Sequence, residues 1–189
     1  MLLQTYLAPP DEEAVVLDAT LSLYALSHSN DGAMDLRVHP LLRPWDPATV
    51  AWSWAAADVG WESPGARAPQ IDRSESHVAS AHLQDCPCSL RWYTFDITEA
   101  VAGWLADPES NHGVLIEGEG SVSKSTSFAA SSYWDKTKRP KLTVRWGWRA
   151  PEPTVAPSPT PTATPTITPS PEPTVPPTPV RVCLPLIGS

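Results

Sequence analysis

The stretch Arg91-Trp-Tyr-Thr-Phe-Asp-Ile-Thr-Glu-Ala-Val-Ala-Gly-Trp-Leu105 predicts a β-strand that continues directly into a short α-helix. In its first part Tyr93 and Phe95 alternate with their neighbours, which is the period of a strand that packs on one face. After Asp96 the period lengthens to that of a helix with one apolar face. The residues on that face are Ile97, Val101, Trp104 and Leu105.

Local signals set the limits of this helix. Asp96 and Glu99 have the spacing of a capping box, so Asp96 can accept from free N–H groups of the first turn. Pro108 predicts the end of the helix, and a turn at residues 111–113 leads into a second strand at residues 114–117.

Alternation predicts further strands on both sides of this unit. Residues 15–26 alternate cleanly, and the same pattern is found at residues 36–38 and 142–146. Prolines break the pattern in residues 41–50, and residues 45–92 as a whole are expected to be irregular. The residues expected to face inward are Leu17, Ala19, Leu21 and Leu23 in the first of these strands, and Leu142, Val144 and Trp146 in the last. Many short strands separated by turns indicate an all-β domain.

Several of these segments resemble the DNRLRE domain family when they are taken in order. The motifs that carry the resemblance are Ala19-Thr-Leu-Ser-Leu-Tyr24, Thr49-Val-Ala-Trp52 with Trp61-Glu-Ser-Pro-Gly65, Phe95-Asp-Ile-Thr98 with Val101 and Trp104, Asn111 with Gly113-Val-Leu-Ile116, and Arg139-Pro-Lys-Leu-Thr-Val-Arg-Trp146. They cover residues 1 to about 148. The aspartate, threonine and tryptophan of the third motif are also similar to the core of growth-factor propeptides, which are not catalytic.

This resemblance implies an antiparallel, jelly-roll-like β-sandwich with one short helix. Domains of the family occur in bacterial and archaeal surface proteins, and some are classed as carbohydrate-binding modules. Compared with the family pattern, the first strands are missing before Met1. We therefore expect a sandwich with one incomplete, unpaired sheet edge.

The composition divides the chain into three parts. Residues 1–148 are enough for one core. Residues 149–179 are rich in proline and threonine, and we expect a disordered, extended linker or stalk there. Residues 180–189 form a short apolar tail that resembles the leucine-proline-leucine tail of some bacterial surface proteins. We expect either an attachment of this tail to the cell envelope or a frayed end.

Charge and length restrict the class of partner. The chain has 189 residues and a net charge of −8, which disfavours nucleic acid as a ligand. No run approaches the roughly 20 apolar residues of a membrane span. Met1 to Leu7 is too short and too polar for a signal peptide, so the expected extracellular or cell-surface location depends on the stalk and the resemblance.

The segment 131–139 is the candidate binding site. It places aromatic and basic side chains on one loop, where a ring can stack on a sugar and a cation can pair with a uronate. A solvated loop with one buried ring is the plain alternative. The candidate residues are Tyr133, Trp134, Lys136, Lys138 and Arg139, together with Trp54 from a tryptophan-rich region that also holds Trp45, Trp52 and Trp61. Of that region, Trp52 and Trp61 match family positions and are expected to be structural.

Other chemistry has little support in the sequence. His77, His82, Cys86 and Cys88 are a set of metal-ligand types, but their spacing is not that of a usual zinc site. We expect no metal, no cofactor and no catalytic residue, because neither a nucleophile elbow nor a recognisable pair of carboxylates occurs. The expected function is a non-catalytic module that binds a polysaccharide or cell-wall glycan. A structural or adhesion subunit is the alternative, and a fragment of a secreted hydrolase is the third.

Overall fold

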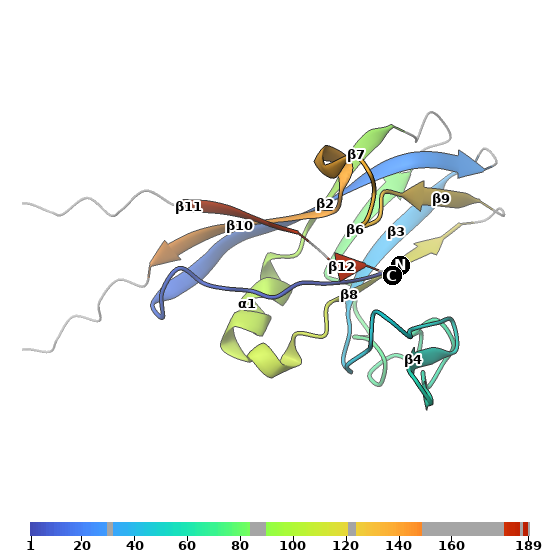
Figure 1. Cartoon of the computed structure of the whole chain (residues 1–189), viewed down its shortest axis with the longest axis horizontal. Coiled ribbons are helices and arrows are strands. Elements are labelled where there is room, and N and C mark those ends of the chain that lie inside the picture. The colour runs from blue at the N-terminus through green and yellow to red at the C-terminus, as the bar shows by residue number, and fades with distance from the viewer. Residues whose placement is uncertain (30–31, 84–89, 121–123, 149–179, 186, 189) are drawn as a thin grey trace, which may run out of the picture.

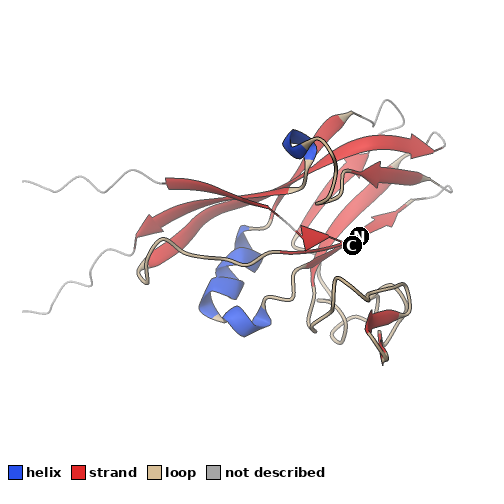
Figure 2. Ribbon diagram, in the orientation of Figure 1, coloured by secondary structure: helices blue, strands red, loops and turns tan. Residues whose placement is uncertain are grey.

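The computed structural model describes residues 1–29, 32–83, 90–120, 124–148, 180–185 and 187–188. Two antiparallel sheets pack face to face (Figures 1 and 2). The first sheet has the order β12 (Ile187–Gly188), β1 (Leu2–Gln4), β8 (Val114–Glu119), β3 (Met34–Pro40) and β6 (Ala79–Leu83). The second has the order β11 (Val180–Pro185), β10 (Lys141–Trp148), β2 (Ala14–Ser29) and β7 (Arg91–Asp96), with β9 (Ser125–Phe128) also paired to β2.

The smaller elements connect these strands. They are the hairpin of β4 (Trp54–Ala56) and β5 (Val59–Gly60), the helix α1 (Thr98–Ala106), and the 3-10 turns η1 (Pro108–Ser110) and η2 (Lys136–Lys138). The predicted all-β antiparallel sandwich with one short helix is confirmed for the described residues. The predicted disorder of residues 149–179 lies outside them.

The strand-to-helix unit forms as predicted, with one difference at the helix start. Tyr93 and Phe95 are buried in the core, and so are Val101 and Trp104 of α1. Asp96 accepts from the first turn as predicted, through the backbone N–H of Thr98, but the N-cap position belongs to Ile97, whose side chain makes no capping hydrogen bond.

Asp96 and Thr98 together hold the start of the helix. Its backbone N–H and Oγ1 both donate to Oδ1 of Asp96, at 3.0 and 2.6 Å. The same Oγ1 accepts from the backbone N–H of Ala19 at 2.9 Å. Thr98 therefore ties the first turn of α1 to β2.

The core between the sheets contains the predicted alternating residues with one exception. Leu21, Val144 and Trp146 are completely buried, but Leu17 is 48% exposed. The register of β2 against β10 shifts at this point: Arg145 lies opposite Asp18, whereas Trp146 lies opposite Val16. This bulge places an extra residue in β2 and reverses the side to which Leu17 points.

The segment 41–78 connects β3 to β6 and is called the connecting segment below. It encloses a second, smaller hydrophobic cluster against the first sheet; the buried members are Leu2, Leu41, Trp45, Ala55, Trp61, Ala66 and Leu115. The prediction that residues 45–92 are irregular misses β6, which pairs with β3 along five residues. Its sequence, Ala-Ser-Ala-His-Leu, has small residues where a strand signal needs large ones.

The tail strands occupy both sheets on one side of the sandwich. β11 pairs with β10 from Trp146↔Val180 to Lys141↔Pro185, and β12 pairs with β1. Figure 1 shows the two chain ends side by side as a result. The structure differs here from the expected unpaired edge, since β1 has a neighbour on each side.

Candidate functional site

The predicted binding loop lies between β9 and β10 and contains η2. Trp134 is 78% exposed, and its ring lies 5.6 Å from that of Tyr133, measured between centroids. Asp135 caps η2: its Oδ1 accepts from the N–H and Oγ1 of Thr137, at 3.0 and 2.6 Å. These hydrogen bonds, from the Thr137 hydroxyl above all, lower the pKa of Asp135, so the cap stays charged.

Two of the three predicted cations hold this loop in place. Nε of Arg139 donates to the carbonyl of Tyr133 at 2.7 Å. Nζ of Lys138 lies 3.5 Å from the carboxylate of Asp135 and 5.1 Å from the ring centroid of Tyr24. Lys136 is exposed at the surface of the loop.

The loop continues onto the outer face of the second sheet. Tyr24 of β2 and Trp92 of β7 are cross-strand partners, with ring centroids 5.3 Å apart in an edge-to-face arrangement. Nζ of Lys141 lies 4.7 Å from the Trp92 ring centroid, as Lys138 lies over Tyr24. We call the whole set the aromatic–lysine surface; its members are Tyr24, Trp92, Tyr133, Trp134, Lys136, Lys138 and Lys141.

Sequence reasoning missed three of these residues, namely Tyr24, Trp92 and Lys141. Each was recognisable as outward-facing, because it alternates with a residue assigned to the core. What the sequence did not show is that β2, β7 and β10 are neighbours. Trp54, which was grouped with the loop, lies on β4 in a separate part of the molecule (Figure 1).

A groove of about 480 Å³ lies between the connecting segment and β8. Its walls are mostly apolar and include Trp52, Trp61 and Leu115, with Arg67 and Glu117 at the polar side. Trp52 is 67% exposed, contrary to its expected structural role, whereas Trp61 is 7% exposed and donates from Nε1 to the carbonyl of Ala51 at 3.2 Å.

Gly65 allows the Trp52 ring to approach the backbone. Its φ of +80° favours glycine, and a Cβ there would lie 2.5 Å from Cζ3 of Trp52. The ring is therefore seated on the backbone, with its other side open to solvent. We call this site the Trp52 groove.

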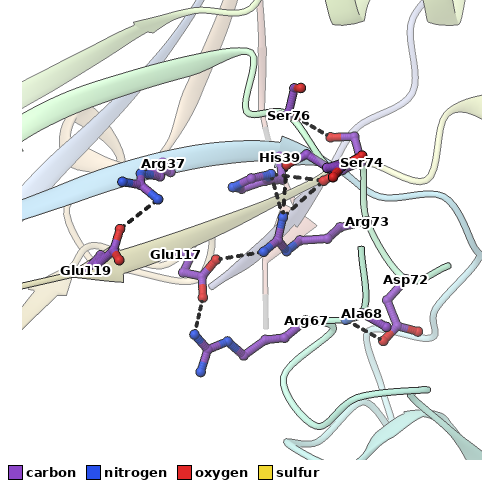
Figure 3. A network of polar contacts seen from close by, with 11 residues as sticks. Arg37, His39, Arg67, Ala68, Asp72, Arg73, Ser74, Ser76, Glu117 and Glu119 are labelled. Carbon is purple, nitrogen blue, oxygen red and sulfur yellow. Dashed lines mark hydrogen bonds and ion pairs between the residues drawn. The ribbon is translucent and has the colours of Figure 1, made fainter. Parts of the chain in front are cut away.

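The charged side of the Trp52 groove is a set of ion pairs (Figure 3). Glu117 lies 2.7 Å from Arg67 and 3.4 Å from Arg73. Nδ1 of His39 lies 2.9 Å from Nη1 of Arg73 and 3.1 Å from the carbonyl oxygen of Ser74, and Nη1 of Arg73 also donates to that carbonyl at 3.0 Å. Burial and the neighbouring Arg73 guanidinium both lower the pKa of His39.

Asp72 organises the connecting segment from its interior. The carboxylate is completely buried and accepts from the backbone N–H groups of Glu62, Ser63 and Ala68, at 3.0, 2.9 and 3.2 Å. Nη1 of Arg43 lies 3.4 Å away. These donors satisfy the carboxylate and close it off from any ligand, so its role is structural.

The four metal-ligand candidates are only partly described. His82 bonds Asp35 through Nδ1 at 2.6 Å, and the His77 ring lies 5.9 Å from that of His39. Cys86 and Cys88 lie outside the described residues. Within the described residues, no group of three or more His, Cys, Asp or Glu side chains is arranged to hold a metal ion.

Fold and surface together define a β-sandwich module whose aromatic–lysine surface combines one exposed ring, that of Trp134, with three partly exposed rings. A family model described as a Disaggregatase related repeat domain matches residues 2–144, and the chain belongs to this family. That name differs from DNRLRE, the family that the motifs resemble, and the fold that the resemblance implies is confirmed. No curated protein matches the chain significantly. Among the described helices, none has the length and apolar character needed to cross a membrane.

Proposed function

We propose that this domain is a non-catalytic module of the cell surface or extracellular space that binds an acidic polysaccharide through the aromatic–lysine surface. The observation that carries the proposal is Trp134, a large ring that is 78% exposed on the loop that also carries Lys136 and Lys138. An exposed ring offers a stacking face to a sugar, and an ammonium group offers a partner to a uronate. The family description, a repeat domain related to disaggregatase, is compatible with such an accessory unit.

The position of two lysines over rings of the same sheet supports an anionic ligand. Lys138 and Lys141 each lie over an aromatic ring, so their ammonium groups are held near one face of the sheet. The protein as a whole carries a net charge of −8. A local excess of cations on an acidic protein favours a specific anionic ligand over general attraction to polyanions.

The test is titration of the whole chain with uronate-containing and neutral polysaccharides, followed by tryptophan fluorescence and by mobility in gels that contain the polymer. We expect retardation by the acidic polymer, a loss of about tenfold or more in affinity for Trp134→Ala, and a smaller loss for Lys136→Ala. Trp54→Ala is the matched control, because Trp54 is also exposed (48%) but lies on β4. Unchanged binding by Trp134→Ala would contradict the proposal.

The Trp52 groove is the second candidate, since it combines an open ring with a polar edge. Loss of binding on Trp52→Ala, with Trp134→Ala unaffected, would move the site to this groove. No binding by a folded sample would favour a structural or adhesion subunit. Release of reducing ends from the polymer would favour the hydrolase alternative.

Attachment to the cell envelope through the tail belongs to the same proposal. Surface labelling of intact host cells that express the full chain or a chain ending at residue 179 tests it. Equal retention of both chains would argue against the tail as the anchor.

A further inference from the structure

The tail closes one side of the sandwich by pairing with both sheets. β11 follows β10 through six paired residues, and β12 then pairs with β1, so that Leu3 lies opposite Gly188. Only residue 186 separates the two tail strands. Pro185 ends β11, and its lack of an N–H suits a position where the ladder stops.

The edges that receive the tail are backbone surfaces. Without β11 and β12, the outer N–H and C=O groups of β10 and β1 would have no strand partner in the described structure. Such edges bind an added strand mainly through main-chain hydrogen bonds. Every copy of the chain carries the same two edges and the same tail.

The linker is much longer than the connection requires. An antiparallel neighbour can be joined by two to about five residues, whereas residues 149–179 separate β10 from β11. The number of residues in this segment sets an upper limit of about 95 Å on its reach, at roughly 3.1 Å per residue. This reach is sufficient to bring the tail to the edges of another molecule.

We propose that the edges of β10 and β1 are a strand-acceptor site, and that the tail of one copy occupies this site in a second copy when copies are crowded together. An exchanged tail makes the same backbone contacts as a tail folded onto its own domain. The ratio of exchanged to unexchanged tails then depends on the effective concentration of the tail near its own domain. That effective concentration is in the millimolar range for a short tether and falls with tether length. Exchange therefore increases as the protein concentration approaches about 1 mM.

The strand register allows the pairing to be detected by a disulfide cross-link, because Cys183 lies opposite Thr143. Directly opposed residues of antiparallel strands have Cα atoms about 4.5–5.5 Å apart, within the range of a disulfide. One full-length chain carries Thr143→Cys and Cys183→Ser, and a second of different mass keeps Thr143 and Cys183. Both carry Cys86→Ser and Cys88→Ser, so a disulfide between the two masses reports an exchanged tail.

Two control chains complete the experiment. An acceptor with Arg145→Cys and Cys183→Ser places its thiol opposite Arg181, two residues out of register. A single chain with Thr143→Cys and native Cys183 reports pairing within one molecule.

We expect the mixed disulfide to form about tenfold more with the Thr143→Cys acceptor than with the Arg145→Cys acceptor, and to rise with protein concentration up to about 1 mM. Equal amounts with both acceptors would overturn the proposal. So would a disulfide that forms only within single chains, because the tail would then stay on its own domain. Failure of that internal disulfide would refute the pairing itself.

Discussion

The sandwich core and the connecting segment both bury large side chains, but they satisfy their backbones differently. In the core, ladder hydrogen bonds pair the strands while Phe95 and Trp146 exclude water. In the connecting segment, the strand pairing among described residues is limited to the short β4–β5 hairpin and to isolated bridges of Arg73 with Leu41 and Pro69. There the carboxylate of Asp72 gathers three backbone N–H groups that have no ladder to join.

This difference predicts how each region responds when one side chain is removed. A ladder distributes its hydrogen bonds along many residues, so losing one side chain removes packing but leaves the backbone satisfied. A loop organised by one buried carboxylate loses several backbone hydrogen bonds with a single side chain. We therefore expect core substitutions to affect the whole domain, and a substitution of Asp72 to affect mainly the connecting segment.

The largest effect is expected from Trp146→Ala. Trp146 is completely buried between the sheets, and its removal leaves a cavity in the core. The free energy of unfolding should fall by about 3–5 kcal/mol, measured by urea denaturation. Trp146→Phe should lower the free energy of unfolding by less, because phenylalanine retains most of the side-chain volume. The substitution also removes Nε1 of Trp146, which is buried without a hydrogen-bond partner. A loss below about 1 kcal/mol for the alanine variant would contradict a single cooperative core.

Asp72→Ala should cost about 3 kcal/mol and act locally. Hydrogen exchange should show lost protection within the connecting segment while β2 and β10 keep theirs. Asp46→Ala is the matched control, because Asp46 also accepts from a backbone N–H, that of Ala48 at 2.9 Å, but in an exposed turn. Uniform loss of protection across both sheets would show that the two regions unfold together.

Gly113→Ala tests the junction between the two regions. Gly113 has a φ of +81°, a Cβ there would lie 2.1 Å from the carbonyl oxygen of Leu3, and its own carbonyl accepts from Leu41 at 2.9 Å. A loss of about 1–3 kcal/mol is expected in thermal or urea unfolding. Gly103→Ala is the control: nothing lies within 4 Å of its Cβ position in α1, and a gain of about 0.5–1 kcal/mol is expected. Equal effects of the two substitutions would exclude the junction as the cause.

The smallest effect is a pH dependence at the same junction. The pKa of His39 is lowered in the folded protein by burial and by Arg73, whereas the hydrogen bond with the Ser74 backbone and the charge of Glu117 oppose the shift and His77 adds to it. The unfolded chain therefore binds a proton more readily. His39 stabilises the fold fully above the unfolded pKa of 6.5, and this contribution is lost as the pH falls from there towards the folded pKa.

The free energy of unfolding should fall less between about pH 7 and pH 5 in His39→Gln than in the unchanged chain. This is roughly the range in which a histidine with a lowered pKa takes up its proton. Urea denaturation at several pH values measures the slope. An unchanged slope in the variant would assign the dependence to other groups, among them His112, whose pKa burial also lowers.

The sequence predicts the regular half of this molecule well. The alternation in β2, β3, β7 and β10 and the apolar face of α1 are local patterns, and burial in the structure follows them. The exceptions are Leu17, where the strand pairing shifts by one residue, and β6, whose small residues give no alternation signal.

The candidate site could be predicted only in part. Tyr133 and Trp134 are adjacent in sequence, so their loop stood out from the sequence alone. Tyr24, Trp92 and Lys141 join it through strand pairing between distant segments. Their outward direction was readable, but their proximity was not.

The sequence by itself determined the period of β2, β3, β7 and β10 and the strand-to-helix unit, because these depend on neighbouring residues. Tertiary structure alone decided which strands became neighbours, which three N–H groups donate to Asp72, and that β11 and β12 pair with β10 and β1. The physical reason is that a buried carboxylate or a sheet edge forms hydrogen bonds with backbone groups, and backbone groups are the same for nearly every residue type. No local pattern specifies that partner.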